Sequence, residues 1–349
     1  MRTSYKIFGV LAGAAAIVVS CGAASHLRAL QPPTVPAVQP IAAPVITTVP
    51  RNPFQRGIDI DWYHYQGQQV TPDALATRAY LNRLHANAVS ISFPFFMNGT
   101  RPGSVHRTIA TPTPGQLATA IGIFEQAGMY ISLRPLLDEK SLGRSRVGWV
   151  PSSQPRWFRS YERFLKPYAE MAQRQRVNEF IVGTEMKGFD LSPAWNGLVR
   201  KMRGWYHGTL ACADNWDRLV TRGCAVKIQT VDAYSPAHSF NFAASWEQFD
   251  RRLQPGMVET EVGIAAAKYA WHKPWILNWP VGGVDPQTQA QWFTAACKAS
   301  RSTHLGGIYF WSIGLATTQP VGPTLASQTT WTGGPGARAI AHCFRGIAR

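Results

Sequence analysis

The stretch EFIVGTEMKGFD, residues 179–190, joins a short apolar run to an acidic side chain. The residues that follow Glu179 favour a β-strand, and the run ends with Thr184 and Glu185. An ionised carboxylate is costly to bury unless a partner compensates for it, so its place at the end of a buried strand needs a reason. Apolar runs that end in polar side chains occur several more times along the chain.

Apolar runs of this kind alternate with amphipathic stretches along the chain. Strands are predicted at 57–61, 88–95, 130–137, 179–185, 209–216, 225–234, 256–264 and 306–314. Helices are predicted at 71–87, 113–128, 155–175, 192–208, 285–301 and 337–347. Thr71, Thr113, Ser192 and Asp285 are their predicted starts. Eight strand and helix units predict an α/β protein with a closed (β/α)8 TIM barrel, and an open doubly wound sheet is the alternative.

The chain is strongly basic. Its 349 residues include 35 Lys and Arg against 19 Asp and Glu, a formal net charge of +16. Residues 1–56 hold five of the basic residues and no acidic one, so 30 basic and 19 acidic residues remain, a balance of +11. No dense run of Lys and Arg of the kind that follows a phosphate backbone is present. We therefore interpret the excess as general surface charge and expect no nucleic-acid partner.

The first residues resemble an export signal. Arg2 and Lys6 precede an apolar run at 7–19, which is shorter than the roughly 20 residues of a membrane-spanning helix. The run ends in the sequence VVSC, which resembles the lipobox of bacterial lipoproteins. Residues 1–21 are thus predicted to be a signal peptide, with Cys21 as the lipidation site. An ordinary cleaved signal and an uncleaved anchor are the alternatives.

A proline-rich segment follows the signal. Seven prolines lie between Gln31 and Pro53, with almost no charge among them. Such a segment cannot hold a helix or a sheet ladder and is expected to be extended and semi-rigid. We predict a linker at 22–55 and one (β/α)8 domain at 56–349.

Four cysteines remain if Cys21 carries the lipid. In an exported protein they suggest two disulfides, with three pairings open. We favour Cys212 with Cys224, which closes a short loop, and Cys297 with Cys343, which joins the last helix; free buried thiols are the alternative. There is no CxxC sequence and no metal-ligand spacing of Cys and His, so no metal or cofactor is expected.

Polar and aromatic residues collect at the same end of most predicted strands. In a (β/α)8 barrel the active site lies at the carboxyl ends of the strands. The residues at these ends are Asp59, Asp61, Arg134, Asp138, Glu185, Asn215, Asp217, Asp232, Tyr234, Glu261 and Trp311. Any one of them is compatible with a structural ion pair, but their agreement over many strands indicates a site.

Glu185 and Glu261 are the two glutamates among them. They end the fourth and the seventh predicted strand, which face each other across a barrel mouth. Two carboxyl groups roughly 5–5.5 Å apart perform retaining glycoside hydrolysis, one as nucleophile and the other as acid and base. Each ionised carboxylate also raises the pKa of its neighbour. A pair of structural glutamates bound to Arg or Lys is the alternative.

The motifs resemble a known enzyme family. LRPLLDE, FIVGTEMKGFD, ADNWD, VDAYSP and TEVG occur in this order within residues 56–315, and they resemble glycoside hydrolase family 113. This family is similar in fold to the barrels of glycoside hydrolase clan A. The resemblance implies a (β/α)8 fold, retention of configuration, no metal, and β-1,4-mannan as the substrate of known members.

The resemblance also implies roles for individual residues. Glu185 would be the acid/base and Glu261 the nucleophile, with Tyr234 bonded to the nucleophile and Trp311 beneath the −1 sugar. Most of the clan has Asn before the acid/base, where this chain has Thr184, and Asn215 is a candidate for the same contact. The predicted substrate-binding residues are Asp59, Trp62, Arg134, Thr184, Asn215, Tyr234, Trp279 and Trp311. Trp149 and Trp331 are further candidates for sugar platforms.

We thus predict a monomeric retaining glycosidase of β-linked glycan, either mannan-like or from the cell envelope. It is expected to be exported and held at the membrane by a lipid, or else to be secreted or periplasmic. A transglycosylase that remodels envelope glycan and a glycan-binding lipoprotein without activity are the alternatives. Two carboxylates at this spacing favour an enzyme over a binding protein.

Overall fold

The computed structural model describes residues 53–98, 103–280, 282–316 and 321–347. The predicted signal peptide, Cys21 and most of the predicted linker lie outside the described residues. Within them, none of the helices is both long and apolar enough to cross a membrane.

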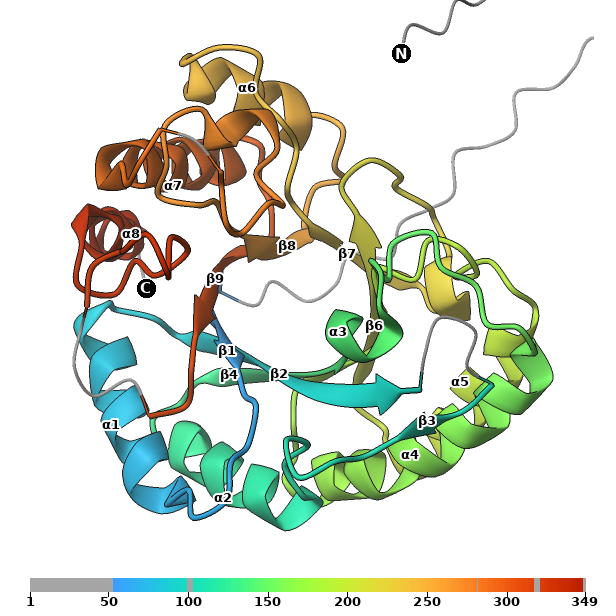
Figure 1. Cartoon of the computed structure of the whole chain (residues 1–349). Coiled ribbons are helices and arrows are strands. Elements are labelled where there is room, and N and C mark those ends of the chain that lie inside the picture. Colours follow the sequence, from blue (N-terminus) through green and yellow to red (C-terminus); the bar gives the residue numbers. More distant parts are fainter. Residues whose placement is uncertain (1–52, 99–102, 281, 317–320, 348–349) are drawn as a thin grey trace, which may run out of the picture. The chain divides into compact units, whose positions relative to one another are not determined.

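Eight parallel strands form a closed barrel (Figure 1). They are β1 (Gln55–Asp61), β2 (Ala88–Met97), β4 (Tyr130–Leu137), β5 (Glu179–Thr184), β6 (Thr209–Asn215), β7 (Ile228–Asp232), β8 (Val258–Val262) and β9 (Gly307–Ile313). The strand β1 pairs with both β2 and β9, which closes the sheet and excludes the open doubly wound alternative. The predicted (β/α)8 barrel is therefore confirmed. The two-residue strand β3 (Val105–His106) adds an antiparallel pair to the end of β2.

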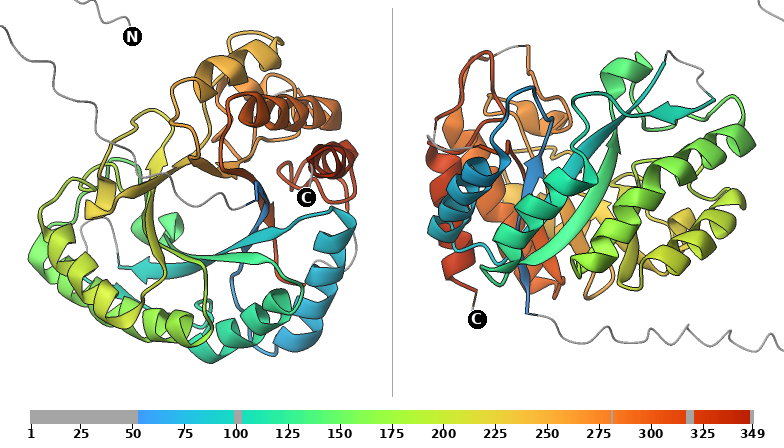
Figure 2. Two further views of the ribbon diagram at one scale, coloured as in Figure 1. Left: turned by 180° about the vertical axis from the view of Figure 1, so that it is seen from behind. Right: turned by 90° about the horizontal axis from the view of Figure 1, so that it is seen from below.

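The helices lie outside the strands (Figures 1 and 2). They are α1 (Val70–Arg83), α2 (Pro114–Glu125), α4 (Gln154–Arg174), α5 (Ala194–Trp205), α6 (Phe242–Asp250), α7 (Pro286–Ser302) and α8 (Pro335–Arg345). The short helix α3 (Glu139–Leu142) and the 3-10 turns η1 (Gly223–Ala225) and η2 (Ala270–His272) lie in connecting segments. Neither α3 nor α6 was predicted, because both are short and their apolar pattern is weak.

Side-chain caps decide where several helices begin. The Thr113 hydroxyl accepts from the backbone of Gln116 in a capping box, and Asp285 accepts from the first turn of α7, as predicted. The prediction for α1 was wrong: the helix begins at Val70, one residue before the predicted cap Thr71. The start of α5 was also misplaced, because Pro193 occupies the cap position although Ser192 accepts from Ala194.

Two disulfides join elements of the domain. Cys212 on β6 is bonded to Cys224 in η1, and Cys297 on α7 is bonded to Cys343 on α8. These are the two favoured pairings. The second links the last helix to its neighbour, so that the end of the described chain packs against the barrel.

Candidate active site

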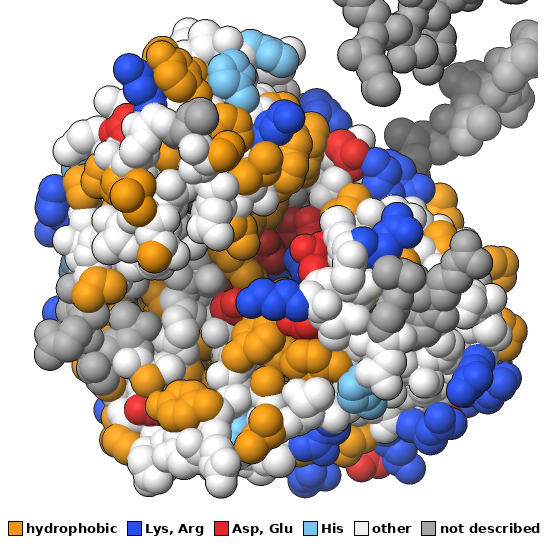
Figure 3. Space-filling model, in the orientation of Figure 1, with side chains coloured by type: hydrophobic (Ala, Val, Ile, Leu, Met, Phe, Trp, Pro, Cys, Tyr) orange, Lys and Arg blue, Asp and Glu red, His pale blue; other side chains and the backbone are white. Residues whose placement is uncertain are grey.

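A cavity of about 1140 Å³ lies at the carboxyl ends of the barrel strands. Figure 3 shows this hollow with acidic and basic side chains at its floor and hydrophobic side chains along its rim. The residues that line it and that come from strand ends are Asp61, Phe96, Leu136, Glu185, Asn215, Tyr234, Glu261 and Trp311. The strand-end residues named by the sequence are thus largely brought to one cavity.

Glu261 is held from two sides. Its Oε1 lies 2.5 Å from Nη2 of Arg134, and its Oε2 accepts a 2.6 Å hydrogen bond from the Tyr234 hydroxyl. The residue is buried on β8. One oxygen is fixed by a cation and the other by a neutral donor, so the carboxylate cannot rotate freely. A nucleophile requires such a fixed orientation.

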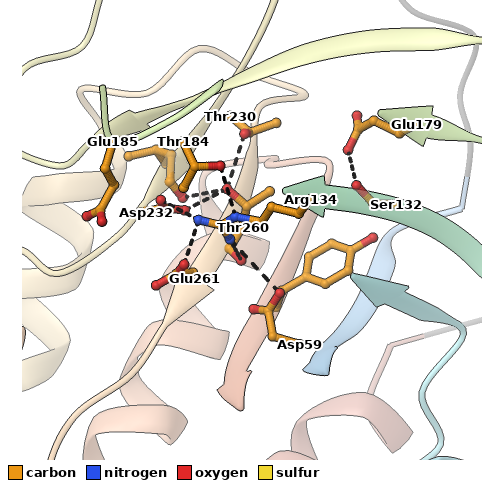
Figure 4. Close-up of polar contacts among 12 residues, drawn as sticks. Asp59, Ser132, Arg134, Glu179, Thr184, Glu185, Thr230, Asp232, Thr260 and Glu261 are labelled. Carbon is orange, nitrogen blue, oxygen red and sulfur yellow. Dashed lines mark hydrogen bonds and ion pairs between the residues drawn. The ribbon is translucent and has the colours of Figure 1, made fainter. Parts of the chain in front are cut away.

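Arg134 is the centre of the polar network below the cavity (Figure 4). Its guanidinium is fully buried and also lies 2.5 Å from Asp232 and 4.0 Å from Asp59. Its Nε donates to the Thr184 hydroxyl at 3.3 Å. A buried charge is tolerated only when it is paired and hydrogen-bonded, so these contacts explain how a cation can lie inside the barrel.

Burial and Arg134 act in opposite directions on the pKa of the carboxyl groups in this network. Burial raises the pKa of Asp59 and Asp232 well above the ordinary value, and Arg134 opposes the rise. Arg134 is thus paired with three carboxyl groups, of which only Glu261 lines the cavity.

Glu185 lies directly after β5 in a left-handed backbone conformation, with φ of 51°. Its backbone N–H donates to Ala213 on β6 at 3.0 Å, which holds this conformation. A non-glycine residue in this region is uncommon and often marks a functional position. Figure 4 shows the carboxyl groups of Glu185 and Glu261 pointing toward the same open side of the network.

The Glu185 carboxyl group is buried beside a second cation. Nη2 of Arg146 lies 2.7 Å from its Oε2. Burial raises the pKa of Glu185, Arg146 lowers it, and Glu261 raises it again, with a net rise. A carboxyl group with a raised pKa can hold the proton that a general acid must deliver.

Arg146 was not predicted from the sequence. It lies in the segment that follows α3, where its backbone N–H donates to Glu139 at 2.7 Å and its Nη1 donates to the carbonyl of Leu137 at 3.3 Å. A single arginine in a connecting segment has no periodic signal that could have indicated it. Its position depends on α3, which was also missed.

Asp61 is another carboxyl group at the cavity. It ends β1, and its Oδ1 is buried without a hydrogen-bond partner in the described part of the chain. Burial and the negative charge of Glu261 raise the pKa of Asp61 to about 7. The residue was noticed at a strand end but was not among the predicted substrate-binding residues, which included Asp59 instead.

Five of the other predicted substrate contacts lie at the cavity or directly beneath it. Asn215 and Trp311 line the cavity, and the Trp311 ring lies 6.0 Å from the Arg134 guanidinium. Asp59, Arg134 and Thr184 lie beneath the cavity surface in the buried network. They support the lining residues and do not themselves line the cavity.

Most of the proposed sugar platforms are core residues instead. Trp62 has 1% of its surface exposed and donates to Gln68, and Trp149 and Trp331 are buried as well. Trp279 is half-buried, and its backbone pairs with the side chain of Gln328. None of the four lines the cavity. This placement disfavours them as sugar contacts, because packing against the core occupies their ring faces.

Two other tryptophans line the cavity. Trp216 follows β6 directly, and Trp275 lies between β8 and α7. Trp216 stood in the quoted motif ADNWD, so its position after a strand end could have indicated it. No described group of three or more Asp, Glu, His or Cys residues is arranged to hold a metal ion.

Comparisons with known proteins agree with this geometry. The model of Glycoside Hydrolase Family 113 matches residues 59–319. A search of curated proteins finds no match. The structure is similar to the GH113 beta-mannanase AaManA from Alicyclobacillus acidocaldarius in complex with ManMIm. The TM-score is 0.72 at 20% identity, and the match covers 85% of this chain and 99% of the other.

Two further solved structures are similar to this chain. A GH113 beta-1,4-mannanase matches with a TM-score of 0.72 at 17% identity, over 84% of this chain and 99% of the other. A b-glucuronidase from Ruminococcus gnavus in complex with D-glucuronic acid matches with a TM-score of 0.54 at 10% identity, over 84% of this chain and 49% of the other. At these identities the likeness concerns the fold.

Proposed function

This chain belongs to glycoside hydrolase family 113 and is a glycoside hydrolase, and from this premise we propose that it cleaves β-1,4-linked mannan with retention of configuration. One observation carries the proposal: Glu261 is fixed by Arg134 and Tyr234, while Glu185 is buried, has a raised pKa and faces the same cavity. The family resemblance seen in the sequence is confirmed by the match.

The proposed reaction has two displacement steps. In the first, the Glu261 carboxylate attacks the anomeric carbon, the glycosidic C–O bond breaks, and the leaving oxygen takes the proton of Glu185. In the second, water attacks the anomeric carbon, gives a proton to Glu185 and releases Glu261. Tyr234 holds one oxygen of Glu261 in line during both steps, and Arg134 pairs with the other.

The choice of mannan rests on the relatives. The similar structures of the same family are described as beta-mannanases or as a beta-1,4-mannanase. The cavity of about 1140 Å³ exceeds the roughly 300–1,000 Å³ of a pocket for one small ligand, which suits an oligomeric substrate.

To test this, the purified protein is incubated separately with β-1,4-mannan, with envelope glycans and, as a control, with a β-1,4-glucan. The products are identified by mass spectrometry. Proton NMR of the first product gives the anomeric configuration. We expect mannan fragments, and we expect their new reducing end to appear first as the β anomer. Cleavage of an envelope glycan alone would contradict the substrate, and a first α anomer would contradict retention. The Glu261→Gln variant should abolish turnover of any substrate found.

We further propose that the enzyme is exported and lipid-anchored, as its first 21 residues suggest. The support is the basic start, the short apolar run and the VVSC sequence that ends at Cys21. The full-length protein made in bacterial cells is expected to partition into the detergent phase, and Cys21→Ser should move it to the aqueous phase. Equal partitioning of both proteins would contradict the lipid anchor.

A further inference from the structure

Trp216 and Trp275 form a pair of stacked rings at the edge of the cavity. Their ring centroids are 5.4 Å apart and their planes differ by 19°. Trp275 has 43% of its surface exposed and Trp216 is half-buried, whereas Trp62, Trp149 and Trp331 are buried in the core. An exposed tryptophan leaves a large apolar face in water, so a stacked pair at a cavity edge indicates a binding surface.

In the order of the strands, Trp216 lies on the Glu185 side of the site, and Trp275 stacks on it from the segment after β8. Trp216 follows β6, and β6 is hydrogen-bonded to β5, the strand that Glu185 follows. Trp311 belongs to β9, which pairs with β8, the strand of Glu261. The acid protonates the oxygen of the leaving sugar, so the Trp216 side receives the leaving group and the Trp311 side receives the sugar that is attacked.

Polar groups adjoin the rings. Asp217 is ion-paired with Lys187 and accepts a 2.5 Å hydrogen bond from Asn215. Burial opposes ionisation of Asp217, but the hydrogen bonds from Lys187 and Asn215 outweigh it and lower its pKa. Asn215 and Asp217 line the same cavity as Trp216. A pyranose ring needs such a combination, an apolar face to stack on and hydrogen-bonding groups at its edge.

We propose that Trp216 and Trp275 form a platform for the pyranose unit on the leaving-group side of the scissile bond. This proposal rests on the proposed glycosidase function and adds a subsite to it. The platform would also bind the acceptor sugar that competes with water for the glycosyl-enzyme. It would thereby set the balance between hydrolysis and transfer.

The test compares Trp275→Ala with the control Phe240→Ala. Phe240 is an aromatic residue with 58% of its surface exposed and does not line the cavity. Each variant is assayed with β-1,4-mannohexaose and with a β-mannobiosyl fluoride, whose leaving group is too small to reach the platform. Trp275→Ala should lower kcat/KM for the hexaose by about tenfold, equivalent to about 1.4 kcal/mol, and leave the fluoride unchanged. Trp275→Phe should restore part of the loss.

Equal losses on both substrates would overturn the assignment to the leaving-group side, and no loss on either would overturn the platform. At high hexaose concentration, the fraction of transfer products should also fall in Trp275→Ala; an unchanged fraction would contradict acceptor binding.

A binding measurement separates this proposal from the proposed function. Calorimetry with the Glu261→Gln variant uses mannohexaose, cellohexaose and chitohexaose as probes. Binding of any of them that weakens about tenfold in Glu261→Gln/Trp275→Ala supports the platform, even if mannan is not cleaved and the substrate proposal fails. Failure of all three to bind, or binding that does not respond to Trp275→Ala, overturns the platform.

Discussion

An ion pair joins Arg146 and Glu185, with Nη2 of the arginine 2.7 Å from Oε2 of the glutamate. The proposed general acid therefore has a cation beside it that favours the deprotonated form. Burial and the charge of Glu261 act in the opposite direction. The working pH range of the enzyme depends on this balance, since a general acid must begin the reaction with its proton.

Arg146→Met should move the alkaline limb of the kcat/KM profile to higher pH. Removal of the cation raises the pKa of Glu185, so the acid keeps its proton at a higher pH. The measurement is kcat/KM for mannohexaose from about pH 4 to about pH 9. Arg144→Met removes a charge from an exposed position in the same segment and should leave the limb in place. If the alkaline limb lies at the same pH in the Arg146→Met variant and the unaltered enzyme, this ion pair does not set the pKa of the general acid.

Glu185→Ala should affect substrates according to their leaving groups. Natural glycosides need a proton on the leaving oxygen, so their turnover should fall about 10²- to 10⁴-fold, the usual contribution of general acid catalysis. Dinitrophenyl glycosides leave without a proton, so formation of the glycosyl-enzyme should be nearly as fast as in the unaltered enzyme. The burst of dinitrophenol in a rapid-mixing experiment measures this step. Comparable losses on the two substrates would contradict the acid role of Glu185.

Tyr234→Phe should slow the reaction without unfolding the barrel. The change removes the 2.6 Å hydrogen bond to Glu261 and keeps the ring. A hydrogen bond to a charged group contributes about 1.5–3 kcal/mol, so kcat should fall about 10- to 100-fold. The measurement is kcat on mannohexaose, together with the melting temperature.

Tyr309→Phe is the matched control for Tyr234→Phe. The Tyr309 hydroxyl is buried too, but it donates to Gln55 at the start of β1, away from the cavity. This change should lower the unfolding free energy by about 1 kcal/mol and leave kcat intact. A similar loss of kcat in both variants would show that the effect of Tyr234 is structural.

The fold could be predicted because strands and long helices have a regular apolar period. All eight barrel strands and the helices capped by Thr113 and Asp285 follow from such patterns. The positions of Glu185 and Glu261 at strand ends could be predicted for the same reason, since parallel strands bring their carboxyl ends together.

The missed residues lie where no period exists. Arg146 and Trp275 come from long connecting segments, whose path is set by tertiary contacts and not by local sequence. For a related reason, the sequence does not show which tryptophans besides Trp311 line the cavity. Exposure of a tryptophan depends on which helix packs against it, and composition does not report that.

A carboxyl pair far from the cavity predicts how stability depends on pH. Asp250, the last residue of α6, and Glu259 on β8 are both buried, and they lie close enough that each acts on the pKa of the other. Two neighbouring carboxyl groups can hydrogen-bond to each other only if one holds a proton. Burial raises the pKa of Asp250 to about 7, and burial and Asp250 raise the pKa of Glu259 well above its ordinary value.

The unfolding free energy should therefore fall as the pH rises from about 4 to about 7 through this pair. In this window the unfolded chain has lost the protons that the folded pair still holds, so rising pH favours unfolding. Asp250→Asn supplies an amide donor to Glu259 without a titrating proton. Urea denaturation at several pH values should show a weaker fall for Asp250→Asn than for the unaltered protein or for Glu125→Gln, which changes an exposed carboxylate at the end of α2. An identical slope in all three proteins would contradict a shared proton between Asp250 and Glu259.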